Sequence, residues 1–509
     1  MKAKNNQTPG WNTRSWLSLR TAVQVIAFLL FIVLFLNWRP LLMRLDPLAM
    51  LANLISSRTF EALSAIALIM VALALVTGRA WCGWLCPLGT VLDWFSFNRL
   101  RRWNLQLHDG WRSVKYMILF AIILAAIFTN LTLMIFDPLT IMVRSFAVAV
   151  WPALDSVITG GEMLLSMIPP LQPAIANFND FVRPALLPAE PLIYTDSLLF
   201  GLIFLGIIAL NLISERFWCR YLCPLGAFYG LIAKIGIIRR RVNTSCIHCK
   251  LCEDACPTGT IQRKKDCSSD PSECIVCLKC MDSCPCATSD FGPVYTAAKW
   301  NSYDPHLRHL LIGSGAAVVL ALLSHIIPAA RRKDTALVWP PGATERSLCD
   351  RCIRCGLCIK SCPTAAIQPV PIGNDARVLW APSIVPRTGF CQYSCNNCGQ
   401  ACPAQAIPAL SLKVKQDTPI GWAYIDRNRC LPWAENTPCI VCEEMCPVPQ
   451  KAIILTTVQV NDGKGGKIEL QRPGVVKQRC IGCGLCEYKC PVSGQAAIRV
   501  EPNDNGELL

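Results

Sequence analysis

The sequence of 509 residues predicts an α-helical membrane domain followed by small, cysteine-rich α+β domains. Apolar stretches long enough to cross a bilayer are concentrated before residue 235, and the more polar remainder holds 27 of the 31 cysteines. Most of these cysteines lie two or three residues apart, in groups that end in Cys-Pro. Thiols so close in sequence pair poorly with one another but converge readily on a metal cluster.

Five apolar stretches predict transmembrane helices, since a helix needs ~20 residues to cross a bilayer. They span about residues 21–38, 60–78, 114–136, 195–213 and 309–328. No small-residue cleavage site follows the first stretch, which is also longer than the core of a signal peptide, so we expect it to remain as an anchor. The sequence therefore predicts a four-helix membrane domain at 1–235 and a fifth transmembrane helix at 301–330.

The distribution of Lys and Arg predicts the orientation in an inner, cytoplasmic membrane. Basic residues are frequent in the 79–115 loop and after residue 215, whereas the 137–194 loop has only Arg144 and Arg183. Because basic loops stay on the cytoplasmic side, the N-terminus and the segment after 215 are predicted to be cytoplasmic. A fifth span then places the chain after about residue 330 in the periplasm.

The membrane domain contains an internal repeat. A span, an Asp-Pro-Leu sequence, a second span and a Cys-x-x-x-Cys-Pro-Leu-Gly sequence occur in this order twice. Two copies of the same topology predict a pseudo-twofold axis along the membrane normal. The repeated residues are the aspartates Asp46 and Asp137 and the cysteines Cys82, Cys86, Cys219 and Cys223.

The two cysteine pairs predict a further iron–sulfur or other redox site, because four thiolates from the two copies can meet at one point. The alternative is that they are buried apolar cysteines or disulfides, and a reducing cytoplasm disfavours disulfides. Asp46 and Asp137 are candidate functional residues, because ionisable groups at membrane depth are costly. The alternative for them is a turn-forming Asp-Pro at a helix end.

Two runs of four cysteines between residues 236 and 300 predict a two-cluster domain. Each run reads Cys-x-x-Cys-x-x-Cys-x-x-x-Cys-Pro, the spacing of bacterial two-cluster ferredoxins, in which the fourth cysteine of each run ligates the other cluster. Zinc needs four ligands per site and leaves this pattern unexplained. The predicted ligand sets are Cys246, Cys249, Cys252 with Cys284, and Cys274, Cys277, Cys280 with Cys256.

Four more runs between residues 331 and 509 predict a four-cluster domain, which brings the total to six [4Fe–4S] clusters. The cysteines of these runs are Cys352, Cys355, Cys358, Cys362; Cys391, Cys395, Cys398, Cys402; Cys430, Cys439, Cys442, Cys446; and Cys480, Cys483, Cys486, Cys490. We expect Cys267, Cys286 and Cys349 not to be ligands.

The composition and missing motifs exclude several functions. The formal charge of +15 is largely offset by clusters that each carry about −2 when oxidised, so nucleic-acid binding is not expected. The sequence has no Cys-x-x-Cys-His, no G-x-G-x-x-G between a strand and a helix and no P-loop. Covalent haem, hydride cofactors and nucleotide hydrolysis are therefore not predicted.

With these motifs in place, residues 1 to about 300 resemble the membrane quinol dehydrogenase family of NapH, which is related to MauN and to the membrane part of NosR. Residues 330–509 resemble NapG and MauM, four-cluster ferredoxin-type proteins, and the most specific match is RCLPWAENTPCIVCEEMCP. The resemblance implies a membrane protein in a multi-subunit complex that oxidises quinol from the quinone pool. Its redox partner would be a c-type cytochrome or a reductase subunit. With quinol as the substrate, the paired aspartates Asp46 and Asp137 are the candidate acceptors of its protons, because they are ionisable groups at membrane depth.

The resemblance also implies which cysteines of the four-cluster domain share a cluster, with the outer runs exchanging their fourth cysteines and the inner runs doing the same. The implied sets are Cys352, Cys355, Cys358 with Cys490; Cys480, Cys483, Cys486 with Cys362; Cys391, Cys395, Cys398 with Cys446; and Cys430, Cys439, Cys442 with Cys402. Two other functions remain open at this stage. One is a maturation or regulatory redox protein of the membrane, and the other is a cluster-carrying subunit of a respiratory complex without its own quinone site.

Overall fold

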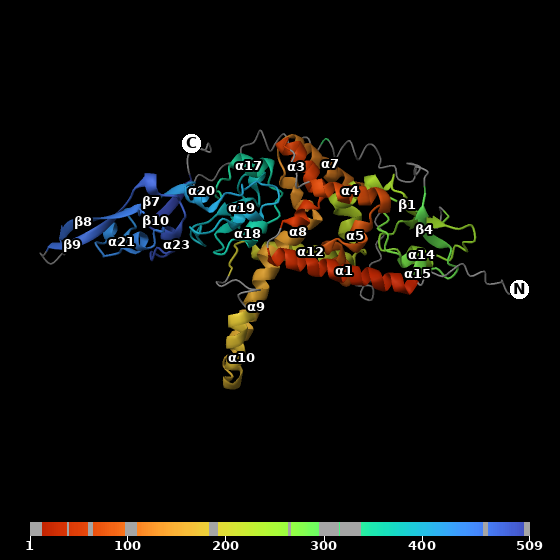
Figure 1. Cartoon of the computed structure of the whole chain (residues 1–509), viewed down its shortest axis with the longest axis horizontal. Helices are drawn as coiled ribbons and strands as arrows, with labels where there is room; N and C mark the ends of the chain where they lie inside the picture. The colour runs from red at the N-terminus through yellow and green to blue at the C-terminus, as the bar shows by residue number, and fades with distance from the viewer. Residues whose placement is uncertain are drawn as a thin grey trace.

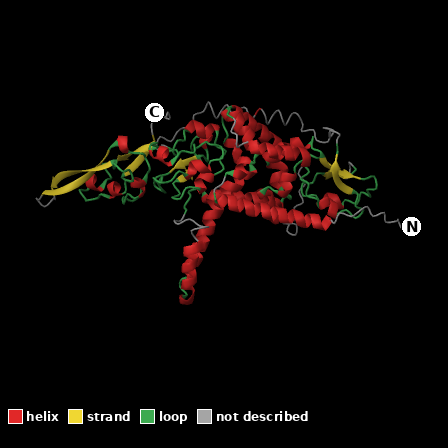
Figure 2. Cartoon of the chain, in the orientation of Figure 1, coloured by secondary structure: helices red, strands yellow, loops and turns green. Residues whose placement is uncertain are grey.

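The computed structural model describes residues 13–37, 40–59, 65–96, 109–182, 192–262, 266–294, 315, 337–461 and 467–502. The molecule is elongated, with a helical domain in the middle and cysteine-rich parts containing strands at its two ends (Figure 1). Helices dominate the centre, and the strands lie toward the ends (Figure 2). The helical domain therefore lies between the first and the second cysteine-rich part.

The helical domain consists of apolar helices and short connecting helices. The longer ones are α1 (Thr13–Leu36), α3 (Pro47–Ser57), α4 (Ile66–Thr77), α7 (Val114–Ile127), α12 (Ser197–Ala209) and α13 (Pro224–Ala233). The shorter helices are α2 (Leu41–Arg44), α5 (Ala80–Trp84), α6 (Pro87–Trp94) and α8 (Pro138–Ser145). Four of these helices, α3, α6, α8 and α13, begin with proline, which suits the first helical position because its missing N–H has no intrahelical partner there.

Three helical stretches among the described residues are long and apolar enough to cross a membrane, namely Ser15–Leu36, Gly110–Ile127 and Pro138–Leu165. The first two fall on the predicted spans at 21–38 and 114–136. The predicted spans at 60–78 and 195–213 form shorter apolar helices, Ile66–Thr77 and Ser197–Leu212. The fifth predicted span, 309–328, lies outside the described residues apart from residue 315. The count of five therefore stays a prediction.

The sequence pattern did not predict the long stretch Pro138–Leu165, because charged side chains and Pro152 interrupt its apolar run. In the structure α8 continues through a five-residue π-helix into α9 (Trp151–Leu165). Together with α10 (Gln172–Asn177), α9 extends away from the helical domain, across its long axis (Figure 1). Its outer part exposes apolar side chains, with Val157 71% and Met163 68% exposed.

The first cysteine-rich part contains two small antiparallel sheets and two single-turn helices. Strand β1 (Ile238–Val242) pairs with β4 (Ser289–Pro293), and β2 (Ile261–Gln262) pairs with β3 (Ser268–Ser269). The helices α14 (Leu251–Asp254) and α15 (Lys279–Asp282) each hold the third cysteine of a run. This α+β arrangement agrees with the predicted ferredoxin-type domain.

The second cysteine-rich part consists of a near half that packs on the helical domain and a far half beyond it (Figure 1). The near half contains α17 (Glu345–Asp350), α18 (Leu357–Lys360), β5 (Ile367–Pro369), β6 (Pro382–Ile384), α19 (Asn397–Ala401) and α20 (Leu412–Gln416). The far half contains β7 (Gly421–Ile425), α21 (Leu431–Ala434), α22 (Val441–Glu444), β8 (Ile453–Asn461), β9 (Lys467–Val475), α23 (Leu485–Tyr488) and β10 (Ile498–Pro502). Strands β5 and β6, β7 and β10, and β8 and β9 form antiparallel pairs.

The near half is fixed to the helical domain by hydrogen bonds and by one buried arginine. The Leu131 N–H donates to the Cys349 carbonyl oxygen over 3.2 Å. The Arg144 guanidinium donates to the Arg354 carbonyl oxygen over 3.2 Å and stacks on the ring of Trp380, 4.6 Å from its centroid. These contacts place the start of the second cysteine-rich part against the bundle.

Candidate cluster sites and a central cysteine site

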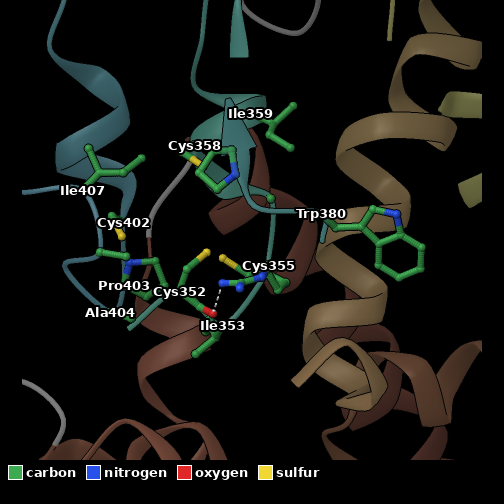
Figure 3. A pocket seen from close by; sticks show the side chains of 14 residues that line it. Cys352, Ile353, Cys355, Cys358, Ile359, Trp380, Cys402, Pro403, Ala404 and Ile407 are labelled. Carbon is green, nitrogen blue, oxygen red and sulfur yellow. Dashed lines mark hydrogen bonds between the residues drawn. The ribbon is translucent and has the colours of Figure 1, made fainter. Parts of the chain in front are cut away.

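The first site of the near half is a cavity lined by four cysteines (Figure 3). Cys352 and Cys355 come from the turn that leads into α18, Cys358 lies in α18, and Cys402 comes from the end of α19. The Arg354 guanidinium lies beside the cavity and donates to the Cys352 carbonyl oxygen over 2.7 Å. Four sulfur atoms around one cavity fit the ligand set of a [4Fe–4S] cluster.

Three further sites complete the second cysteine-rich part. In the near half, Cys362 interacts electrostatically with the thiols of Cys391, Cys395 and Cys398. In the far half, one cavity is lined by Cys430, Cys439, Cys442 and Cys490, and another by Cys446, Cys480, Cys483 and Cys486. Each half therefore contains two four-cysteine sites.

This grouping shows that the cysteine pairing implied by the resemblance is wrong. Cys402, not Cys490, lies with the first run, and Cys490 lies with the third run. Neighbouring runs exchange their fourth cysteines because each half folds as one two-cluster unit. The antiparallel pair β5–β6 lies between the runs of the near half, and β8–β9 lies between those of the far half. Closing these short segments costs less chain entropy than joining the first run to the last.

The first cysteine-rich part brings together the sets that the ferredoxin spacing predicts. One cavity is lined by Cys246, Cys249, Cys252 and Cys284. The thiols of Cys274, Cys277 and Cys280 interact with Cys256. The binding of iron at these six sites stays a prediction that the donor sets support.

The expectation that Cys267, Cys286 and Cys349 are not ligands stays a prediction, because two of them line a cluster cavity. The Cys349 thiol donates to the Arg377 carbonyl oxygen over 3.8 Å. Cys267 is 1% exposed and lies against His248 and Cys246, with the ligand atoms of all three within 4.8 Å. Cys267 and Cys286 line the same cavity as the first ligand set.

Burial favours the protonated form of the thiols at the four-cysteine sites. It raises the pKa of Cys402 to about 11, and the neighbouring thiol of Cys352 adds to the effect. It likewise raises the pKa of Cys277 to about 11, with Cys256 adding to it. Because a cluster binds thiolates, assembly at these sites must release protons.

A seventh group of four cysteines lies inside the helical domain, and we refer to Cys82, Cys86, Cys219 and Cys223 as the central cysteine site. All four are buried, with 4–7% of their surface exposed. Cys82 lies in α5 and Cys219 in a single π-turn, while Cys86 and Cys223 cap α6 and α13. The thiol of Cys86 interacts with those of Cys82 and Cys219, and the thiol of Cys223 with all three others. The two copies of the motif thus meet.

Two buried arginines each donate a hydrogen bond from one copy of the motif to the other. Arg79 lies three residues before Cys82, and it donates to the carbonyl oxygen of Cys219 over 3.4 Å. Arg216 lies three residues before Cys219, and it donates to the carbonyl oxygen of Cys82 over 2.7 Å. Each guanidinium is 1% exposed. The arginines therefore hold the two halves of the central cysteine site together.

The glycines of the two Cys-Pro-Leu-Gly sequences make room for these arginines. A Cβ atom on Gly226 would lie 2.7 Å from Nη2 of Arg79. A Cβ atom on Gly89 would lie 2.8 Å from the carbonyl oxygen of Cys82 and 3.4 Å from Nη1 of Arg216. Glycine is thus required for the close approach of the guanidinium groups.

Among the described residues around the central cysteine site, several cations form ion pairs with two carboxylates. Two carboxylates, Asp93 and Glu273, face five cations. These cations are Arg20, Arg79, Arg112, Lys115 and Arg216. Buried charges need partners, and thiolates bound to a metal cluster would carry negative charge that complements the nearby Arg79 and Arg216.

Asp46 and Asp137 lie in equivalent positions, each at the N-terminus of a helix. Asp46 accepts from the N–H groups of Leu48 (2.9 Å) and Ala49 (3.3 Å). Asp137 accepts from those of Leu139 (2.9 Å) and Thr140 (3.0 Å). The capping role expected from Asp-Pro is therefore present in both copies. The two side chains are also 2% and 0% exposed and interact with each other.

The sites follow one another along the molecule. The Arg216 guanidinium interacts with the thiols of both Cys219 and Cys277, so the central cysteine site adjoins the first cysteine-rich part. At the other end of the helical domain Arg144 interacts with Cys355 of the near half. The near and far halves are joined by a 2.8 Å hydrogen bond from the Cys391 N–H to the Cys483 carbonyl oxygen.

Several of these residues escaped the sequence interpretation. The arginines Arg79 and Arg216 carry a signal that could have been found, because both copies read Arg-x-Trp-Cys. Glu273 and Tyr229, a buried tyrosine of α13, have no such pattern. Their positions follow from tertiary packing alone.

A helical domain with apolar helices and a chain of four-cysteine sites defines a class, the membrane-associated ferredoxin-type electron-transfer proteins. The model of a 4Fe–4S binding domain matches residues 60–106 and 197–245, which contain the central cysteine site. Other 4Fe–4S binding domain models match residues 241–262 and 477–493, and a 4Fe–4S dicluster domain model matches residues 351–407. The dicluster match covers the two runs of the near half.

The relatives identify the family. The methylamine utilization ferredoxin-type protein MauM of Methylorubrum extorquens is 34% identical over 210 residues, 40% of this chain and 91% of the relative. The ferredoxin-type protein NapG of Escherichia coli is 28% identical over 200 residues, 38% of this chain and 84% of the relative. The ferredoxin-type protein NapH of Haemophilus influenzae is 27% identical over 223 residues, 43% of this chain and 62% of the relative. No solved structure matches the chain.

This chain belongs to the family of MauM ferredoxin-type proteins. The additional similarity to NapG and NapH fits a fusion of a NapH-like part with a NapG-like or MauM-like part.

Proposed function

We propose that the protein takes electrons from a membrane quinol and conducts them through its iron–sulfur clusters to a partner oxidoreductase. The observation that carries the proposal is the succession of four-cysteine sites along the molecule, with the central cysteine site inside the apolar helical domain. Six sites outside that domain suit six [4Fe–4S] clusters, and the central site suits a further redox centre. A maturation or regulatory protein would not need so many sites in series.

We further propose that the two cysteine-rich parts face opposite sides of the membrane, the first the cytoplasm and the second the periplasm. Their attachment at opposite ends of the helical domain supports this arrangement (Figure 1). The direct test is proteolysis of sealed right-side-out vesicles. We expect cleavage within 340–509 and protection of 240–290 until the vesicles are permeabilised. Protection of both regions in sealed vesicles would show that they share the cytoplasm.

Electron conduction is tested with the full chain in proteoliposomes. A reduced quinol is added to the bilayer and an impermeant one-electron acceptor to one side. We expect acceptor reduction by the wild type and its loss in the double variant Cys82→Ser/Cys219→Ser, while the iron content of the six outer sites is kept. Equal rates of acceptor reduction in the variant and the wild type would show that electrons do not pass through the central cysteine site. A wild type that reduces no acceptor with any quinol would refute the quinol role.

A further inference from the structure

The aspartates of the repeat have oxygen atoms that capping does not use. Asp46 caps its helix with Oδ1 and Asp137 with Oδ2. The second oxygens, Asp46 Oδ2 and Asp137 Oδ1, are buried and accept from no N–H or O–H group within the described part of the chain, and the two side chains lie within hydrogen-bonding reach of each other. Because the two side chains interact with each other, both free oxygens belong to one buried polar cluster.

A tyrosine joins this cluster to the central cysteine site. Tyr229 of α13 is fully buried, and its hydroxyl also lacks a hydrogen-bond partner in the described residues. The hydroxyl interacts electrostatically with Asp46 and Asp137 on one side and with Cys82 and Cys86 on the other. Tyr229 thus lies between the carboxyl pair and the cysteines.

The charge around the carboxyl pair favours bound protons. The cation that interacts with Asp137 is Arg144, whose own guanidinium donates to the carbonyl oxygens of Ile135 and Arg354 and stacks on Trp380. No ion pair joins Arg144 to either carboxyl group in the described structure. Two adjacent buried carboxylates repel each other and lose hydration, so at least one of them binds a proton.

We propose that Asp46 and Asp137 form a proton site whose occupancy follows the redox state of the central cysteine site. The inference rests on the proposed redox role of that site. One proton is shared by the pair when the centre is oxidised. On reduction, the centre would receive one electron that originates from the quinol, and one proton would leave a hydronium ion of the solvent, breaking an O–H bond there, and bind to the remaining carboxylate oxygen. The only bond formed is the O–H bond of the carboxyl group, and reoxidation releases both the electron and the proton.

The residues have separate roles in this proposal. The carboxyl groups hold the protons, and Tyr229 is a positioning residue that lies between the carboxyl pair and the cysteines. Burial of the pair favours a proton store inside the helical domain over a group that touches the quinol directly. In a medium of low polarity, the central cysteine site is easier to reduce when a bound proton compensates the charge of the added electron.

The experiment is a redox titration of the central centre in the purified full chain, followed by electron paramagnetic resonance at several pH values. We expect the wild-type midpoint potential to fall by about 59 mV per pH unit, the tenfold change per unit of one proton per electron. Asp46→Asn and Asp137→Asn should flatten this dependence, and the double variant should abolish it. Asparagine caps helices as well as aspartate, so the loss of capping does not explain such a result.

Two further variants keep the test decisive. Asp155→Asn changes another buried carboxyl group, one on α9 that interacts with Lys360, and it should keep the wild-type slope. Tyr229→Phe removes only a hydroxyl and should shift the pH at which the potential begins to change. A wild type without a central signal would refute the proposed function. The proton site alone would be refuted if the midpoint potential of the central centre did not change with pH. It would also be refuted if the asparagine variants and Tyr229→Phe all kept the pH dependence of the wild type.

Discussion

Replacement of Glu273 by glutamine is expected to loosen the first cysteine-rich part from the helical domain. Glu273 is 3% exposed, and its two carboxylate oxygens accept from Nζ of Lys115 over 2.5 and 2.6 Å. It also accepts from Nη1 of Arg79 over 3.3 Å. Loss of one partner of a buried ion pair costs about 3–5 kcal/mol because the other charge is left uncompensated. At ~1.4 kcal/mol per tenfold, the docking equilibrium should change by roughly two to four powers of ten.

Hydrogen exchange of the backbone in β1–β4, measured by mass spectrometry on the intact protein, reports this loosening. The matched control is Asp290→Asn in the same part, where Asp290 pairs with Arg241 over 3.3 Å but the side chains are 63% and 48% exposed. A surface pair of this kind contributes about 0–1 kcal/mol, so the control should exchange nearly as the wild type does. Equal protection from exchange in the two variants would contradict the expected role of Glu273 in holding the first cysteine-rich part to the helical domain.

The same carboxylate predicts an acid limit for docking. Burial by itself would raise the pKa of Glu273, but Lys115, Arg79 and Arg112 together hold this pKa below its ordinary value of 4.5. A folded pKa below the unfolded one means that the ionised group stabilises docking above about pH 4.5. This contribution is lost as the pH falls through the lowered pKa. Exchange in β1–β4 should therefore rise only in acid, and Glu273→Gln should not show this rise.

Three other outcomes follow from the sites. If Cys352 and Cys402 share one cluster, the double variant Cys352→Ser/Cys402→Ser should lose no more than one cluster, about four iron atoms. The double variant Cys352→Ser/Cys490→Ser should lose two clusters. The reverse result in iron analysis would support the pairing of the outer runs. Gly226→Ala should displace Arg79 and weaken the signal of the central centre, whereas an unchanged spectrum would show that the guanidinium can move without consequence. Anaerobic iron and sulfide analysis of the wild type should give at least 24 iron atoms, the count for six four-iron clusters, and stoichiometric zinc would contradict the cluster assignment.

Local spacing determined much of the chemistry of this protein. The triads such as Cys352, Cys355 and Cys358 lie on one short turn, so their convergence follows from the sequence alone. The small α+β domains around the Cys-Pro steps could be predicted for the same reason. The apolar runs of α1 and α7 likewise predicted helices long enough for a membrane, because most residues along them favour burial in lipid.

Contacts between distant segments needed the tertiary structure. The fourth ligand of each cluster arrives from another run, and the choice of Cys402 over Cys490 depends on which runs fold into one unit. Basic residues such as Arg79 and Lys115, which serve as orientation signals in the sequence, are buried partners of Glu273 in the structure. Their charge stabilises an interface, so it is not available to the solvent.

The repeat shows the same division within one motif. The sequence determined that an Asp-Pro-Leu motif and a Cys-x-x-x-Cys-Pro-Leu-Gly motif follow each other in the same order twice. Only the packing of α3, α8 and α13 decided that Asp46 and Asp137 face each other beside Tyr229. The physical reason is that burial and charge compensation act across the bundle, between residues whose separation in sequence carries no information about their distance in space.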